Sequence, residues 1–378
     1  MNSHTMGIMV TDLNTATSNK DQTFYKNLCK FGQKLKITIF IFAINQINWE
    51  ENLVVGAIYT KNEKWIKKFY SIPSLIYDRC FFKTKEQYLL YRTQLKKLFM
   101  LQKVQFLGNR LMDKWSVFHV LKSEPFMKKY LPKTELYHNP WKLQQTFLNQ
   151  KQFILKPISG SQGKGILHVE KQIHMKNDQE KSSNQESYVV KGRDKKNNCI
   201  NITYNDFRSF VKHIQSFIHN RKYIIQEYLH LKTTSNTTFD IRALVQKNGS
   251  GEWQFTGMGV RCGQDGSLTS NLHGGGFVKE VHPFLIKEYG EESAFNMIQE
   301  INEINRKLPH ILENHFGRLS ELGIDFGIDL SGNIWFLEAN SKPGRSIFNS
   351  FKDSSLKKTS VQLPIYYAQY LLKQQLGG

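Results

Sequence analysis

Four polar side chains near the C-terminal end of the chain have the types and spacing of a cation site. Asp325 and Asp329 are four residues apart in one apolar run, and Glu338 and Asn340 are two apart in the next. Residues at even spacing leave the same face of a strand. The intervening Ser331-Gly332 predicts a hairpin that sets the two faces side by side. Carboxylate and amide oxygens suit Mg²⁺, whereas a purely structural role would require partners for these acids inside apolar runs.

A lysine and a glycine-rich loop form a second group with chemical potential. Lys156 ends the apolar run QFILKP and is followed by ISGSQGKG. A strand-end lysine holds one ammonium at a defined place, and backbone N–H groups of a glycine-rich loop can surround phosphate oxygens. The loop residues of interest are Ser159, Gly160, Ser161, Gln162, Gly163 and Gly165. The spacing fits neither a Walker A loop nor G-x-G-x-x-G, so a plain hairpin turn is the alternative.

Two further segments carry polar groups at the ends of buried strands. The run KYIIQEYL ends in four residues whose backbone could meet the edge of an adenine ring: Gln226, Glu227, Tyr228 and Leu229. In FDIRALVQ, Asp240 and Arg242 share one face, where they could reach a ribose hydroxyl and a phosphate or carboxylate. The alternative for Gln226–Leu229 is an ordinary strand end, and the alternative for Asp240 and Arg242 is a simple salt bridge.

The elements that position these groups are short strands alternating with helices, which predicts an α/β (α+β) protein. Residues 1–105 read as a small open-sheet domain, and a helix expected over about 86–107 crosses to the next unit. The polar segment 171–200 reads as an inserted hairpin whose return strand is SYVV. Helices are expected over 113–122, 203–220, 283–315 with an interruption at Pro309, and 356–376. Strands are expected at FDIRALVQ, EWQFTGMGVRC, GIDFGIDL and NIWFLEAN.

Composition limits the class of protein. The 378 residues carry 52 Lys+Arg against 32 Asp+Glu, a net charge of +20, which attracts polyanions such as nucleotides or acidic peptides. The four cysteines show no C-x-x-C spacing, which is typical of a reducing compartment. The longest apolar stretch, ITIFIFAI, is too short to span a bilayer. We therefore expect a cytoplasmic protein without a membrane span, and no specific nucleic-acid partner.

Taken in order, these pieces resemble the ATP-grasp superfamily. DKW (113–115) resembles the segment that carries the upstream ATP lysine. FILKP and its glycine-rich loop resemble the segment with the second ATP lysine and the phosphate-covering loop. IIQEYL resembles the hinge that contacts adenine. FDIRALV resembles the strand after the hinge, and GIDFGID with NIWFLEANSKPG resembles the metal-binding end. The succession FDIR, RCG, NLHGGG and WFLEANSKPGR is most similar to the YheC/YheD group of endospore-coat-associated ATP-grasp proteins.

The resemblance implies two α/β lobes that sandwich ATP, over 106–227 with the insertion and 228–378 with the metal site and a C-terminal helix. It implies that Lys114 and Lys156 hold phosphates, that Asp240 meets the ribose, and that Arg242 and Arg261 neutralise a developing acyl phosphate. Mg²⁺, with Mn²⁺ as an alternative, would be held by three residues: Asp325, Glu338 and Asn340.

Three residues are expected at the substrate. Asn271 and Gly275, in NLHGGG, would allow a substrate close to the backbone, and Arg345, after SKPG, would clamp a carboxylate. The alternative for the NLHGGG segment is a turn before the next helix, and the alternative for Arg345 is a solvated basic side chain. No histidine is assigned a role.

The expected function is an ATP-dependent ligase that activates a carboxylate as an acyl phosphate for attack by an amine, or less often a thiol. Its partners would be ATP, an acid and amine pair, and acidic peptides or spore-coat components. The alternative is a spore-coat structural or interaction protein that keeps ATP binding with little turnover.

Overall fold

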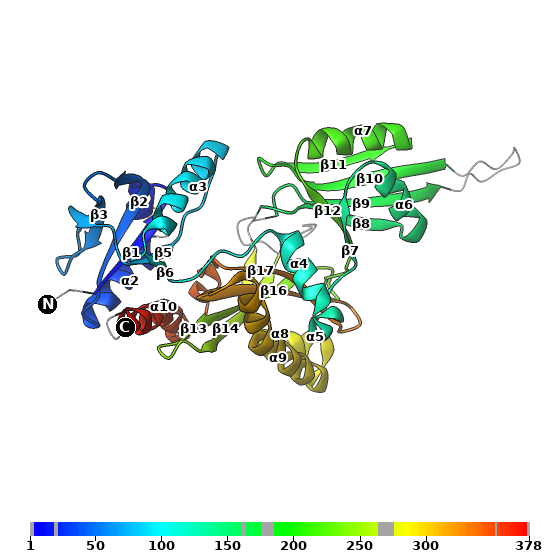
Figure 1. Ribbon diagram of the computed structural model, residues 1–378. Coiled ribbons are helices and arrows are strands. Elements are labelled where there is room, and N and C mark those ends of the chain that lie inside the picture. Colours follow the sequence, from blue (N-terminus) through cyan, green and yellow to red (C-terminus); the bar gives the residue numbers. More distant parts are fainter. Residues whose placement is uncertain are drawn as a thin grey trace, which may run out of the picture.

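The computed structural model describes residues 4–18, 22–160, 163–174, 185–263, 276–351 and 354–375. It is a mixed α/β protein with three sheets, which we call the N-terminal, central and C-terminal sheets (Figure 1). The expected α/β class and the three-part succession of an open-sheet unit and two lobes are confirmed. Within the described residues no helix is long and apolar enough to cross a membrane.

The N-terminal sheet has the strand order β4-β3-β2-β1-β5-β6, in which β2, β1, β5 and β6 are parallel. Its apolar runs form strands because both faces are covered: Ile8 packs toward α2, and Phe42 toward α3. The elements are β1 (Thr5–Val10), α1 (Leu13–Ser18), α2 (Gln22–Lys34), β2 (Thr38–Asn48), β3 (Leu53–Tyr59), β4 (Trp65–Ser71), β5 (Leu75–Asp78), α3 (Lys85–Met100) and β6 (Gln105–Phe106).

The central sheet is antiparallel, in the order β11-β10-β9-β8-β12-β7. Helices α6 and α7 cover one face through Leu143, Phe210 and Ile214, which leaves the other face toward the C-terminal sheet (Figure 1). The elements of this part of the chain are α4 (Lys114–Ser123), α5 (Pro125–Lys128), β7 (Thr134–Tyr137), α6 (Trp141–Asn149), β8 (Gln152–Pro157), β9 (Leu167–His174), β10 (Gln185–Arg193), β11 (Cys199–Tyr204), α7 (Phe207–Ile218) and β12 (Tyr223–Glu227). Of these, α4 and α5 pack against the core of the C-terminal sheet through Val117, Leu121 and Met127.

The C-terminal sheet is also antiparallel, in the order β15-β14-β13-β16-β17. Alternation along β16 places Ile324 and Phe326 against α8 and α9, and Asp325 on the opposite face. The elements are β13 (Phe239–Lys247), β14 (Trp253–Cys262), β15 (Phe277–Lys279), α8 (Val281–Tyr289), α9 (Glu291–Phe316), β16 (Glu321–Ile328), β17 (Ile334–Asn340), the 3₁₀ turn η2 (Ser346–Asn349) and α10 (Ser354–Gln374).

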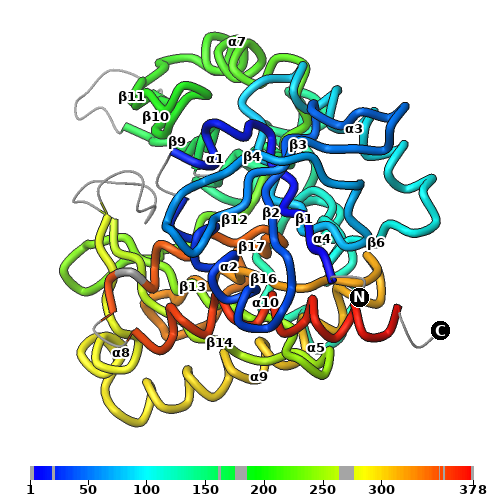
Figure 2. The backbone as a smooth tube through the Cα atoms, turned by 90° about the vertical axis from the view of Figure 1, so that its left-hand side faces the viewer, coloured from blue at the N-terminus to red at the C-terminus, as the bar shows by residue number. Residues whose placement is uncertain are grey.

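The last helix returns to the beginning of the chain. Ile365 and Leu371 of α10 lie in one apolar core with Met6, Ile8 and Leu28. Figure 2 shows the red helix α10 beside the blue helix α2, below the N-terminal strands. The C-terminal helix, which we assigned along the chain to the second lobe, therefore completes the hydrophobic core of the N-terminal unit.

Two expected helix boundaries are wrong. The break in the 283–315 helix lies at Gly290, whose φ of +83° suits glycine, and α9 runs on through Pro309. Leu308, Pro309 and Leu312 are all buried against the C-terminal sheet, so packing offsets the hydrogen bond that proline removes. The segment 199–204, expected in part as helix, is the edge strand β11, because it pairs with β10.

Candidate functional site

One face of the C-terminal sheet carries a row of polar side chains across three strands. Arg242 of β13 is opposite Asp325 of β16, which is opposite Glu338 of β17. Asn340 is opposite Gly323, two positions along the same face. The predicted hairpin and strand parity thus bring Asp325, Glu338 and Asn340 together.

Two arginines neutralise the acids of this row. Arg242 forms a bidentate pair with Asp325, in which its Nη2 lies 2.7 Å from Oδ2. Arg261 of β14 forms a bidentate pair with Asp240 at 2.6 and 2.7 Å, and its Nη2 is also 3.0 Å from Asp325 Oδ2. Both acids are buried, and the paired guanidinium groups supply the counter-charge that buried carboxylates require.

Asp329 does not share this face, which corrects the expected pairing with Asp325. It follows the end of β16 and forms the hairpin turn, where its carboxylate accepts hydrogen bonds from the backbone N–H groups of Ser331 and Asn333 and from Trp335 Nε1. A register shift between Asp325 and Phe326 also interrupts the strict alternation that the spacing argument assumed.

Lys114 links the two lobes at this row. It is the first residue of α4, and Asp113 caps the helix by accepting a hydrogen bond from Ser116 N–H. The Lys114 Nζ atom lies 3.1 Å from Glu338 Oε2 and donates to the Gly160 carbonyl at 2.9 Å. One ammonium therefore bridges the glycine-rich loop of the central sheet and the acidic strand of the C-terminal sheet.

Lys156 lies on the open face of the central sheet, toward the same acids. It is 8% exposed, and its ammonium forms no hydrogen bond or ion pair within the described ranges. Burial and the neighbouring Lys114 lower the Lys156 pKa to about 8, although Glu338 acts in the opposite direction. A buried ammonium with too little negative charge around it is suited to an anionic ligand such as a polyphosphate.

Glu338 and Asn340 have the donor chemistry of a hard-cation site. Burial alone would raise the Glu338 pKa, but Lys114, a hydrogen bond from Asn340 Nδ2, Arg242 and Lys156 together hold it below its usual range. The carboxylate is therefore ionised and available at neutral pH. Asp325 would have to exchange one of its guanidinium partners for a cation. Among the described residues no cluster of three or more His, Cys, Asp or Glu side chains forms a metal site.

The phosphate-loop candidates are described only in part. Ser159 and Gly160 are exposed at the end of β8, and Gly163 and Gly165 have φ values of +73° and +77°, which explains the glycines there. Ser161 and Gln162 lie outside the described residues, as do Asn271 and Gly275.

The hinge candidates lie at the end of β12, together with His168, a histidine to which we assigned no role from the sequence. Gln226 is buried and donates to Thr134 Oγ1, while Glu227 accepts from Lys133 N–H and Leu229 leads into the next segment. The ring of Tyr228 packs on His168 with centroids 4.2 Å apart. His168 lies on the open face of the sheet, opposite Ile154.

Burial lowers the His168 pKa to about 4, so the ring is neutral, and it hydrogen bonds to Gln152. The alternation in ILHVE marks His168 as facing away from the apolar core, and this is the signal that could have identified it.

Arg345 lies in a separate buried cluster. Its guanidinium pairs with Glu321, which also binds Tyr77 and Arg79 of the N-terminal unit. The side chain that we expected to clamp a substrate therefore joins the N-terminal sheet to the start of β16. Its partner Glu321 is 24 residues earlier, at the start of the β16–β17 hairpin, and could not be identified from local spacing.

Comparisons with known proteins agree with this architecture. The model of the family described as YheC/D like ATP-grasp matches residues 103–371. The Bacillus subtilis (strain 168) protein named endospore coat-associated protein YheD is 28% identical over 364 residues, which cover 94% of this chain and 76% of that protein. Endospore coat-associated protein YheC of the same strain is 26% identical over 349 residues, which cover 92% of each.

Among solved structures, that of D-cycloserine synthetase DcsG superposes with a TM-score of 0.55 over 98% of this chain and 99% of that chain. The sequence identity is 11%, so this likeness concerns the fold alone. Together with the family model that matches residues 103–371, this likeness confirms the expected ATP-grasp fold.

Proposed function

The chain belongs to the YheC/D-like ATP-grasp family, and on that premise we propose that it is an ATP-dependent ligase that joins a carboxylate to an amine. The single observation that supports this proposal most is the convergence of Lys114 of α4 and Lys156 of β8 on Glu338 of β17. Two ammonium groups, one of them buried without a partner among the described residues, face a carboxylate and an amide. This is an arrangement for holding a polyphosphate and its divalent cation together.

In this proposal each residue has a limited task. Lys114 and Lys156 bind phosphate oxygens, and Glu338 and Asn340 hold Mg²⁺, or Mn²⁺ in its place. The loop from Ser159 to Gly165 covers the phosphates and excludes water. Bound MgATP would supply the phosphoryl group that activates the substrate carboxylate as an acyl phosphate.

Arg242 and Arg261 lie next to this place and already bind carboxylates. Arg242 would neutralise the substrate carboxylate and the charge that develops on it, while Arg261 keeps Asp240 and Asp325 in position. Such charge stabilisation and positioning account for most of the rate in phosphoryl transfer. The ribose would lie near Asp240, and the adenine near Tyr228 and Leu229 at the hinge.

The names of the relatives support a second, finer proposal about biological role. Both are named endospore coat-associated proteins. We propose that this chain acts in spore formation, either on a coat component as substrate or as a coat-associated protein that keeps nucleotide binding with little turnover.

The test is ADP release by the purified protein with MgATP, in the presence and absence of acidic acceptors and amines. We expect acceptor-dependent ADP release that falls by about 10²-fold or more in Lys156→Met. Lys151→Met, an exposed lysine before the same strand, is the matched control and should retain activity.

Calorimetry with the nucleotide separates the alternatives. ATP binding without acceptor-dependent turnover would favour the coat-associated role, whereas absence of nucleotide binding by the wild type would refute both proposals.

A further inference from the structure

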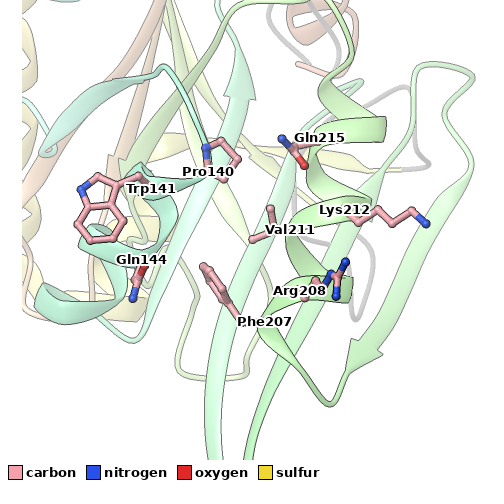
Figure 3. A pocket seen from close by; sticks show the side chains of 8 residues that line it. All are labelled: Pro140, Trp141, Gln144, Phe207, Arg208, Val211, Lys212 and Gln215. Carbon is pink, nitrogen blue, oxygen red and sulfur yellow. The ribbon is translucent and has the colours of Figure 1, made fainter.

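An open groove lies on the outer side of the central lobe, between α6 and α7. The two helices bury Leu143 and Phe210 against the central sheet, and their other edges enclose a cavity volume of about 680 Å³. Figure 3 shows the eight residues that line it: Pro140, Trp141, Gln144, Phe207, Arg208, Val211, Lys212 and Gln215. The nucleotide-facing residues lie on the opposite face of the same sheet, so this groove is separate from the proposed active site.

The interior of the groove is apolar. Phe207 and Val211, one turn apart on α7, point toward Pro140 and the first turn of α6, whereas the Trp141 ring extends away from them at the edge of the groove (Figure 3). Trp141 is 62% exposed, although tryptophan is among the side chains that gain most from burial. Exposed aromatic groups at a concave surface are typical of protein interaction sites.

The rim of the groove is basic: its lining residues include Arg208 and Lys212, and none of the eight is acidic. Neither α6 nor α7 contains Asp or Glu. Lys142 is paired with Glu135 at 2.5 Å, but the exposed Arg208 and Lys212 form no ion pair in the part of the chain that the structure describes. The nearest acid in sequence, Asp206, caps the helix by accepting a hydrogen bond from Ser209 N–H, and its charge also attracts Arg208. Lys212 therefore has the least counter-charge at this rim.

We propose that this groove binds an acidic amphipathic helix of a partner protein. Apolar side chains of such a helix would pack on Trp141, Phe207 and Val211, and its carboxylates would pair with Arg208 and Lys212. The spacing of Arg208, Lys212 and Gln215 along one edge of α7 matches a helix that lies alongside it.

Two other occupants fit less well. Nucleic acid would need a larger cluster of basic groups than the two cations at this rim, and it would not use an aliphatic interior. A second copy of this chain would bring together surfaces of the same charge, in a protein whose net charge is +20.

The probe for the experiment is a fluorescein-labelled synthetic helix of about 14 residues, with leucines at helical spacing along one face and glutamates beside them. Binding to the full-length protein is measured by fluorescence anisotropy. A peptide with lysines in place of the glutamates, and one with the same residues in scrambled order, are the probe controls.

The double variant Arg208→Glu, Lys212→Glu removes the rim charges, and Lys61→Glu, Lys68→Glu makes the same change on exposed lysines of the N-terminal unit. We expect binding to weaken by about tenfold or more in the first variant only, because reversed charges repel the peptide. Trp141 emission should shift to the blue on binding, and this shift should be absent in Trp141→Phe. Circular dichroism and nucleotide binding confirm that each variant is folded.

Four results of the binding experiments would overturn the proposal, and dimerisation through the groove would be a fifth. The binding results are no saturable binding of the acidic helix, equal binding of the lysine or scrambled peptide, equal losses in both double variants, and tighter binding of a single-stranded oligonucleotide with the same dependence on Arg208 and Lys212. Concentration-dependent dimerisation that Trp141→Asp abolishes would assign the groove to a second copy instead.

Discussion

At the scale of single residues, Lys156 is the group whose charge depends most on its surroundings. It is buried beside another ammonium, which lowers its pKa to about 8, whereas an exposed lysine titrates near 10.4. The ammonium is therefore fully charged at pH 6 and about half charged at pH 8 in the ligand-free protein. A polyphosphate bound next to it would favour the charged form and raise the pKa again.

We therefore predict proton uptake when nucleotide binds near pH 8, of up to about half a proton. Uptake by Lys156 should vanish near pH 6, where the group is already protonated. Calorimetry of nucleotide binding in buffers with different ionisation enthalpies measures this quantity.

Lys156→Arg is the informative variant, because arginine keeps the charge and does not titrate in this range. It should bind nucleotide with less proton uptake at pH 8 than the wild type. Equal uptake by both proteins would show that the titrating group is elsewhere.

At the scale of secondary-structure elements, the row of Arg242, Asp325 and Glu338 depends on the close approach of β16 to the segment at Pro343. Gly323 of β16 lies close to both Arg242 and Pro343. A Cβ atom added at Gly323 would lie 2.8 Å from Pro343 Cβ and 3.3 Å from Arg242 Nη1. The absence of a side chain at this position is what leaves room for the Arg242 guanidinium to reach Asp325.

Gly323→Ala should therefore destabilise the fold by about 1–3 kcal/mol, since the Pro343 segment or Arg242 must move. It should also lower turnover, because Arg242 is displaced. Gly344→Ala, where no atom lies within 4 Å of the added Cβ, is the matched control and should change stability by less than about 0.5 kcal/mol. Urea unfolding and ADP release measure the two effects, and equal stability of the two variants would contradict this account of the row.

At the scale of the whole molecule, a buried charge cluster joins the N-terminal unit to the C-terminal sheet. Glu321 is 1% exposed and accepts hydrogen bonds from Tyr77 at 2.5 Å, Arg79 at 3.2 Å and Gln246 at 3.1 Å, besides its pair with Arg345. Arg345 also donates to the Ser360 carbonyl of α10. One carboxylate thus connects β5, β13, β16 and the C-terminal helix.

Glu321→Gln keeps the size of the side chain but leaves Arg79 and Arg345 without their counter-charge. We expect a loss of about 3–5 kcal/mol in the free energy of unfolding, as for other buried pairs that lose one partner. Glu303→Gln, which removes an exposed pair with Lys307 on α9, should cost under about 0.5 kcal/mol. Thermal and urea unfolding of both variants provide the measurement, and a small loss in Glu321→Gln would show that the cluster does not hold the units together.

Much of the local structure could be predicted from the sequence because it depends on neighbouring residues. The apolar alternation in GIDFGIDL and NIWFLEAN, with Gly332 at φ +84° in the turn, was sufficient to predict the hairpin that sets Asp325 beside Glu338. The strand-end position of Lys156 and the cap at Asp113 are likewise local features. The order of these motifs along the chain was sufficient to predict the ATP-grasp fold.

Which partner each charged side chain has could be learned only from the three-dimensional fold. Strand register places Arg242 opposite Asp325. The docking of segments that are distant in sequence pairs Arg345 with Glu321 and lets α10 complete the core of the N-terminal unit. Such contacts are chosen by burial and charge neutralisation over the whole molecule. Spacing along the chain determines which face a side chain leaves, but not what lies opposite that face.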